Sequence, residues 1–160
     1  MSERLTLYVF KGPDKQQFRS IFEQVVRTHA GSITWGEAFK KPNVDCRTTH
    51  QNNVHTVYLP SDSEAGRLLC ALTGMAIGGP WIVLRIQEGS HWDYSLYDSE
   101  RNIDNFSTLP EYWDDPELIA DTKGTPELLA LYWDIPLERV ERILRHGDFG
   151  RLTRTCMRRS

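Results

Sequence analysis

Cysteines and long apolar runs are scarce in this 160-residue sequence. Its three cysteines, Cys46, Cys70 and Cys156, are odd in number and widely spaced, so they predict reduced thiols rather than a disulfide framework or a zinc site. No apolar run reaches the roughly 20 residues that a transmembrane helix needs. The N-terminal residues lack the apolar stretch that follows the basic start of a secretory signal. Together these absences predict a cytoplasmic protein that does not enter a membrane.

Motifs that carry catalysis or hold cofactors are also missing. The sequence has no Gly-x-Ser-x-Gly elbow for an activated serine. The run Gly78-Gly79-Pro80 precedes a predicted strand and lacks the Lys-Ser/Thr of a phosphate-binding loop, so we interpret it as a joint. Cys70 falls on the apolar side of a predicted helix, where a buried, inert thiol is the usual case. We therefore expect no cofactor and no metal, and a non-enzymatic role is favoured over an enzymatic one.

The composition is typical of one globular domain with a real core. Hydrophobic residues make up 39% of the chain and charged residues 26%, which are ordinary values for a soluble protein. We assign residues 1–150 to a single α+β domain. Residues 151–160 contain four arginines and are predicted to form a basic, mobile C-terminal tail.

Three short strands in the middle of the chain organise the predicted fold. Residues 81–86 are apolar on both alternating faces apart from Arg85, which is typical of a strand covered on two sides. Residues 91–97 alternate between apolar and polar side chains, and a shorter strand is predicted at 103–106. Turn-forming residues at 88–90 and 98–102 join the three strands.

The flanking elements complete an α+β pattern. We predict further strands at 5–10, 32–35 and 54–59, an exposed loop at 40–53, and helices that begin near Pro13, Ser61, Thr125 and Asp134. The predicted buried stripe of the first helix comprises Phe18, Ile21, Phe22, Val25 and Val26, and that of the second comprises Ala65, Leu68, Leu69, Leu72 and Met75. The order of elements predicts one largely antiparallel sheet with helices packed mainly on one face.

The charge of the chain is distributed unevenly. Residues 88–127 contain eleven Asp or Glu and two Lys or Arg, although the formal net charge of the whole chain is only −3. An acidic zone of this kind favours a basic protein partner through long-range attraction, and it argues against broad contact with nucleic-acid phosphates. The simpler alternative is a solvated acidic surface that keeps the protein soluble.

Acidic and aromatic residues of this zone are the candidates for a binding surface. Aromatic rings beside charged groups are typical of binding hot spots, although core packing is the default for each ring. The predicted contact residues are Asp93, Asp98, Glu100, Asp104, Tyr112 and Trp113.

Two other functions remain open from the sequence. A small hydrolase or metal-dependent enzyme could use His91, Asp93 and Asp104, because His91 and Asp93 share one face of a strand and paired carboxylates can act as acid and base. A regulatory or nucleic-acid-associated role could depend on the arginine-rich tail at 151–160.

The middle of the chain contains the pattern Trp92-Asp93-Tyr94-Ser95-Leu96-Tyr97-Asp98, followed by Ile103-Asp104-Asn105-Phe106-Ser107 and Pro110-Glu111-Tyr112-Trp113. With this succession, and with Gly124–Leu129, the chain resembles a group of uncharacterised bacterial proteins. The resemblance covers approximately residues 61–146. This chain departs from the group at Ser99–Asn102, where the group has a glycine. No activity is established for the group, so the resemblance implies a fold and no catalytic residues.

Similarity of type adds one expectation about function. Small, acidic, single-domain cytoplasmic α+β proteins are often similar to immunity proteins of bacterial toxin systems. The sequence therefore favours a non-enzymatic intracellular protein-binding module, of the kind that inhibits a basic toxin or nuclease.

Overall fold

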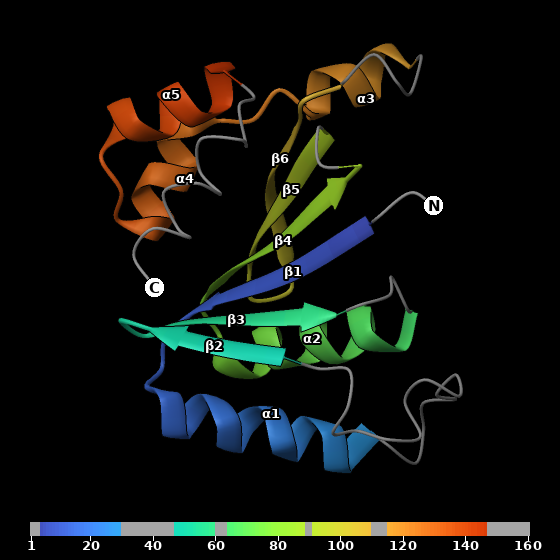
Figure 1. Cartoon of the computed structure of the whole chain (residues 1–160), viewed down its shortest axis with the longest axis vertical. Coiled ribbons are helices and arrows are strands. Elements are labelled where there is room, and N and C mark those ends of the chain that lie inside the picture. The colour runs from blue at the N-terminus through green and yellow to red at the C-terminus, as the bar shows by residue number, and fades with distance from the viewer. Residues whose placement is uncertain (1–3, 30–46, 60–63, 89–90, 110–114, 147–160) are drawn as a thin grey trace.

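The computed structural model describes residues 4–29, 47–59, 64–88, 91–109 and 115–146 (Figure 1). The elements of these segments, in chain order, are β1 (Arg4–Lys11), α1 (Lys15–His29), β2 (Arg47–Gln51), β3 (Val54–Leu59), α2 (Glu64–Ile77), β4 (Pro80–Gln87), β5 (His91–Asp98), β6 (Arg101–Ser107), α3 (Pro116–Asp121), α4 (Pro126–Trp133) and α5 (Leu137–His146). The predicted strand at 32–35, the cap at Ser61, the aromatics Tyr112 and Trp113, and the tail at 151–160 lie outside the described residues.

All the described strands join in one antiparallel sheet, in the order β2-β3-β1-β4-β5-β6. The part β1-α1-β2-β3-α2-β4 has the chain order and spatial order of the split β-α-β motif. The hairpin of β5 and β6 extends this sheet beside β4. The predicted α+β class with a single antiparallel sheet is confirmed.

The first core lies between α1, α2 and one face of the sheet. Alternate residues of a strand point to the same face, and in β1 these are Thr6, Tyr8 and Phe10, of which Phe10 is fully buried. This core comprises Tyr8, Phe10, Phe18, Val57, Cys70, Trp81 and Val83. The α1 and α2 helices therefore cover the β1, β3 and β4 region of this face (Figure 1).

The second core lies on the opposite face, beneath α4 and α5. In β5 the residues Trp92, Tyr94 and Leu96 point to this face, and they pack with Phe106 of β6. The helices contribute Leu128, Leu129, Tyr132, Trp133, Ile143 and Leu144. The helices are thus divided between both faces, which differs from their predicted position mainly on one face. The reason is that the buried rings of β1, Tyr8 and Phe10, and the buried apolar residues of β5 point to opposite faces.

One predicted loop contains a strand. Residues 47–51 of the expected 40–53 loop form β2, which pairs with β3 through a turn at Asn52 and Asn53, whose φ angles are 49° and 59°. Asparagine adopts this left-handed conformation more readily than most residues, so it suits the turn. The strand has no apolar alternation because it is a polar edge strand, and this concealed it in the sequence.

The α2 helix is rotated relative to its predicted orientation. Leu68 and Met75, which we expected in the core, are 47% and 42% exposed. The buried positions are Gly66, Leu69, Cys70, Thr73 and Gly74. Small residues occupy this face because the helix lies close to the indole of Trp81, which leaves little space above Gly74.

Adding a single methyl group at Gly74 should destabilise the fold. A Cβ there would lie 2.5 Å from Nε1 of Trp81, whose indole donates to Ser99 O and stacks on Tyr97, so the ring is held in place. We expect Gly74→Ala to lower the free energy of unfolding by about 1–3 kcal/mol, as overpacking does. Urea denaturation measures this change.

Gly79→Ala is the matched control. Its added Cβ would lie 3.6 Å from the nearest atom, Lys11 O, which is ordinary contact. We expect this variant to unfold within about 0.5 kcal/mol of the wild type. Equal stability of the Gly74→Ala and Gly79→Ala proteins would contradict the proposed packing of α2 on Trp81.

Candidate functional site

The sheet places the predicted acidic contact residues on two different faces. Asp93 points to the face of the first core and lies opposite Arg85. Asp98 points toward α4, where it accepts a 3.4 Å hydrogen bond from the Tyr132 hydroxyl. Asp104 also points to the α4 side. The three aspartates of the predicted contact surface therefore do not form one acidic face.

Asp104 is buried and is bound within the protein. One of its carboxylate oxygens accepts from the Tyr94 hydroxyl at 2.8 Å and from the Thr125 backbone N–H at 2.9 Å. Only 7% of Asp104 is exposed. Burial, together with the hydrogen bond and the negative charge of Asp104, raises the pKa of Tyr94, so its hydroxyl stays protonated as the donor. Asp104 is thus a structural residue, and it is not available for contact with a partner.

Removal of the Asp104 carboxylate should weaken the whole fold. In Asp104→Ala the buried Tyr94 hydroxyl and the part-buried Thr125 N–H lose their acceptor, and a buried unpaired donor costs roughly 1–3 kcal/mol. We expect a fall of about 3 kcal/mol in the free energy of unfolding, measured by urea denaturation. The control is Glu100→Ala at an exposed turn position. An Asp104→Ala protein as stable as this control would contradict the structural role.

A polar surface lies on the face of the β5–β6 hairpin opposite Asp104. We call it the hairpin face and define it by residues of β4, β5 and β6, namely Arg85, Asp93, Ser95, Asn105 and Ser107. The α1 and α2 helices lie over the β1 and β3 region of this side of the sheet, and β5 and β6 extend beyond them (Figure 1). The β5 and β6 part of the hairpin face is therefore a polar surface that extends beyond α1 and α2 (Figure 1).

Arg85 and Asp93 form the centre of the hairpin face. Arg85 Nε donates to Asp93 Oδ1 at 2.6 Å, and Arg85 Nη2 donates to the hydroxyl of Ser95 at 3.1 Å. The side chains of Arg85 and Asp93 are 36% and 25% exposed. Both groups are thus held in one geometry while part of each stays accessible to a partner.

Partial burial controls the charge of Asp93. Desolvation raises the pKa of this carboxyl above its usual value, and the nearby Arg85 guanidinium opposes the rise through its charge and its hydrogen bond. The ionised carboxylate is therefore not fully compensated by Arg85. A donor supplied from outside would stabilise it further.

The remaining predicted contact residues flank the hairpin face or lie outside the described segments. Glu100 is exposed in the turn between β5 and β6, next to the exposed Arg101. Tyr112 and Trp113 fall outside the described residues. The sequence did not reveal Arg85, Asn105 and Ser107 as partly exposed residues, or Ser95 as the buried partner of Arg85. The signal was the single charge in an otherwise apolar strand, since Arg85 breaks the pattern of β4.

The geometry does not bring together the three residues that the sequence suggested for a hydrolase or metal-dependent enzyme. Asp93 and Asp104 lie on opposite faces of the sheet, so they cannot act with His91 on one substrate atom or one ion. Within the described segments no cluster of three or more His, Cys, Asp or Glu side chains could hold a metal ion. The thiol of Cys70 is buried, as its helical position predicted.

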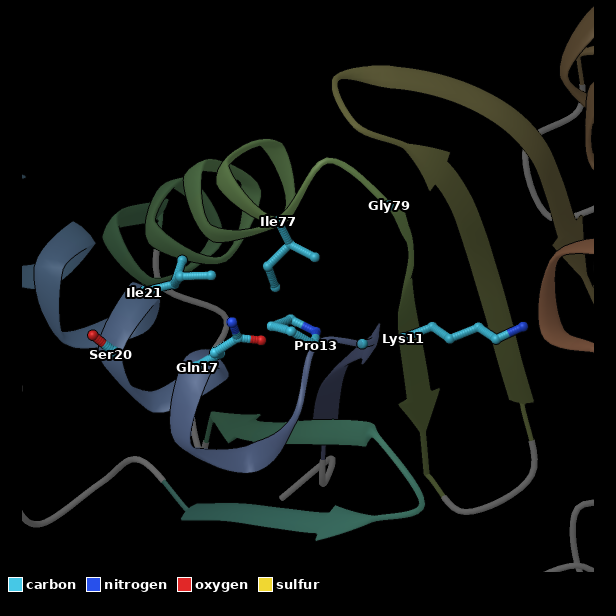
Figure 2. Close-up of a pocket in the computed structure, with 8 residues that line it drawn as sticks. Lys11, Pro13, Gln17, Ser20, Ile21, Ile77 and Gly79 are labelled. Atoms are coloured by element: carbon cyan, nitrogen blue, oxygen red, sulfur yellow. The ribbon is translucent and has the colours of Figure 1, made fainter.

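A shallow depression of about 500 Å³ lies between α1 and the end of α2 (Figure 2). Its lining includes Pro13, Gln17, Ile21 and Ile77, whereas the side chain of Lys11 points away from it. The ammonium group of Lys11 instead donates to Tyr132 O at 3.0 Å on the opposite side of the sheet. No charged side chain points into the depression from its described lining.

No family model matches the sequence, and comparison with curated proteins and with solved structures found no match either. The resemblance to a bacterial protein group therefore stays a prediction. None of the helices in the described part of the chain has both the length and the apolar character of a membrane span.

Proposed function

We propose that this protein is a non-enzymatic, intracellular protein-binding module whose contact surface is centred on the hairpin face. The observation that carries the proposal is the partly exposed Arg85–Asp93 pair, which joins β4 to β5, the strand that extends beyond α1 and α2 (Figure 1). Arginine is enriched in protein interfaces, and a side chain that is already held in place loses little conformational freedom on binding.

The guanidinium of Arg85 leaves donors for a partner. It carries five N–H groups, and its bonds to Asp93 and Ser95 use the Nε and Nη2 groups among the described residues. Asp93 offers the second carboxylate oxygen. A protein surface that supplies both a carboxylate or carbonyl and a basic donor would complement the pair.

The chemistry of the partner is proposed from the surrounding charge. Glu100 lies exposed at one end of the hairpin, and α3, with the exposed Glu117 and Asp121, packs beside β6. This excess of acids favours a basic protein. An immunity-type inhibitor of a basic bacterial toxin or nuclease fits this charge, and it remains the specific form of our proposal.

An arginine introduced on the hairpin face should block binding. The partner is first isolated by affinity capture from the cells that make the protein, and it is then purified and titrated by calorimetry. Asn105→Arg adds bulk and positive charge at a half-buried position of β6, so we expect affinity to fall by about tenfold or more.

The matched control makes the same change of residue elsewhere. Gln24→Arg places an arginine on the exposed surface of α1, away from the hairpin, and should bind like the wild type. Binding that is unaffected by Asn105→Arg, or weakened equally by Gln24→Arg, would overturn the proposed contact surface.

Charge reversal at the turn tests the proposed basic partner. Glu100→Lys should slow association about two- to fivefold at low salt, because it weakens long-range attraction, and the effect should fade as salt is added. Glu138→Lys on α5, which covers the opposite face, is the control. Faster association of the Glu100→Lys protein, measured by stopped flow, would indicate an acidic partner instead.

A further inference from the structure

Two histidines join the β2–β3 hairpin to the start of α1. His50 Nδ1 lies 2.7 Å from His55 Nδ1, and His55 Nε2 lies 2.5 Å from Pro13 O. The His55 ring stacks on Phe18 at 4.5 Å between centroids, and His50 meets Phe18 edge-on at 5.7 Å. His55 is only 1% exposed. This pair is far from the hairpin face and has no part in the binding proposed above.

The hydrogen bonds determine which nitrogens carry protons. Pro13 O can only accept, so His55 Nε2 must be the donor to it. In the neutral ring His55 Nδ1 is then an acceptor, and His50 Nδ1 must donate to it. This leaves His50 Nε2 unprotonated. That nitrogen is buried and has no hydrogen-bond partner among the described residues.

Neither protonated form of the pair fits this arrangement. If His50 takes up the proton, its Nε2 becomes a buried N–H without an acceptor in the described segments. If His55 takes up the proton, its Nδ1 becomes a donor, so His50 must accept there and again carry its own proton on Nε2. Either proton therefore leaves one buried donor unsatisfied.

The surrounding charges act in the same direction. The charged groups that act on His50 are Lys15 and Arg19 from α1 and His55 from β3, and all of them disfavour a further positive charge. Burial is the largest cause that lowers the pKa of His50, followed by His55 and the two basic residues of α1. The folded arrangement thus favours the neutral pair.

We propose that the His50–His55 pair is an acid-sensitive latch, which holds the β2–β3 hairpin against the start of α1 at neutral pH and releases it in mildly acidic solution. When the latch opens, the His50 imidazole reaches water and can take up a proton. The Phe18 ring loses its contacts with both histidine rings at the same time. The β2 and β3 strands form one end of the sheet, so the hairpin can separate by breaking only its pairing with β1, while β4, β5 and β6 stay joined.

The sign of the pH dependence follows from the proton count. The opened form binds protons more readily than the closed form, so its population rises as the pH falls below 6.5, the ordinary histidine pKa. Each proton taken up on opening increases the opening equilibrium by at most about tenfold per pH unit. Above that pH the closed form has its full stability.

Amide hydrogen exchange measures the opening directly. After correction for intrinsic rates, amides of β2 and β3 in the wild-type protein should lose protection severalfold between about pH 7.5 and about pH 5.5, whereas those of β4 and β5 keep theirs. His50→Asn keeps a side-chain N–H that can reach His55 but cannot take up a proton, so its β2–β3 protection should not vary with pH. His91→Asn removes an exposed histidine and should behave like the wild type.

The proton positions can be tested in the wild-type protein without any variant. Nitrogen-15 NMR of the histidine rings should show His50 protonated at Nδ1 and unprotonated at Nε2 near neutral pH. The pKa of His50 should lie below 6.5. A His50 ring protonated at Nε2 in neutral solution would overturn the latch. So would β2–β3 protection that is independent of pH, or that falls equally in the His50→Asn protein.

Discussion

The carboxylate of Asp104 holds one face of the β5–β6 hairpin against the segment that begins α4. It accepts from Tyr94 of β5 and from the backbone of Thr125, so it connects both strands of the hairpin to the segment that begins α4. A buried carboxylate is stable only where such donors are present. Because Asp104 and the apolar residues of β5 share one face, that face belongs to the core beneath α4 and α5. The opposite face is left with the polar residues.

The two pairs of helices therefore cover the sheet diagonally. The α1 and α2 helices pack on one face near β1, β3 and β4, and α4 and α5 pack on the other near β4, β5 and β6 (Figure 1). The β4 strand is covered from both sides, which explains why its sequence is apolar on both faces except at Arg85. Arg85 stays partly exposed and pairs with Asp93 of β5, the strand that extends beyond α1 and α2 (Figure 1). The hairpin face is a consequence of this packing.

Local patterns predicted the strands and the main helices, because alternation and helical spacing report burial directly. The β1, β4 and β5 strands and the α1 helix illustrate this. The β2 strand was missed because edge strands need no apolar alternation. The orientation of α2 depends on its contact with Trp81, which no local pattern shows. The orientation of Asp93 and Asp104 could not be predicted either, because both lie in polar positions of short strands. Only the pairing register of β5 and β6 shows that they point to opposite faces.

The central claim is that one face of the β5–β6 hairpin stabilises the fold and the other contacts a partner. Cross-saturation NMR on the isotope-labelled protein, bound to its purified partner, tests this most directly because it reports which amides lie at the interface. We predict signal losses centred on the amides of Arg85, Asp93, Asn105 and Ser107. Losses centred on α2 or α5, with those four amides unchanged, would contradict the claim.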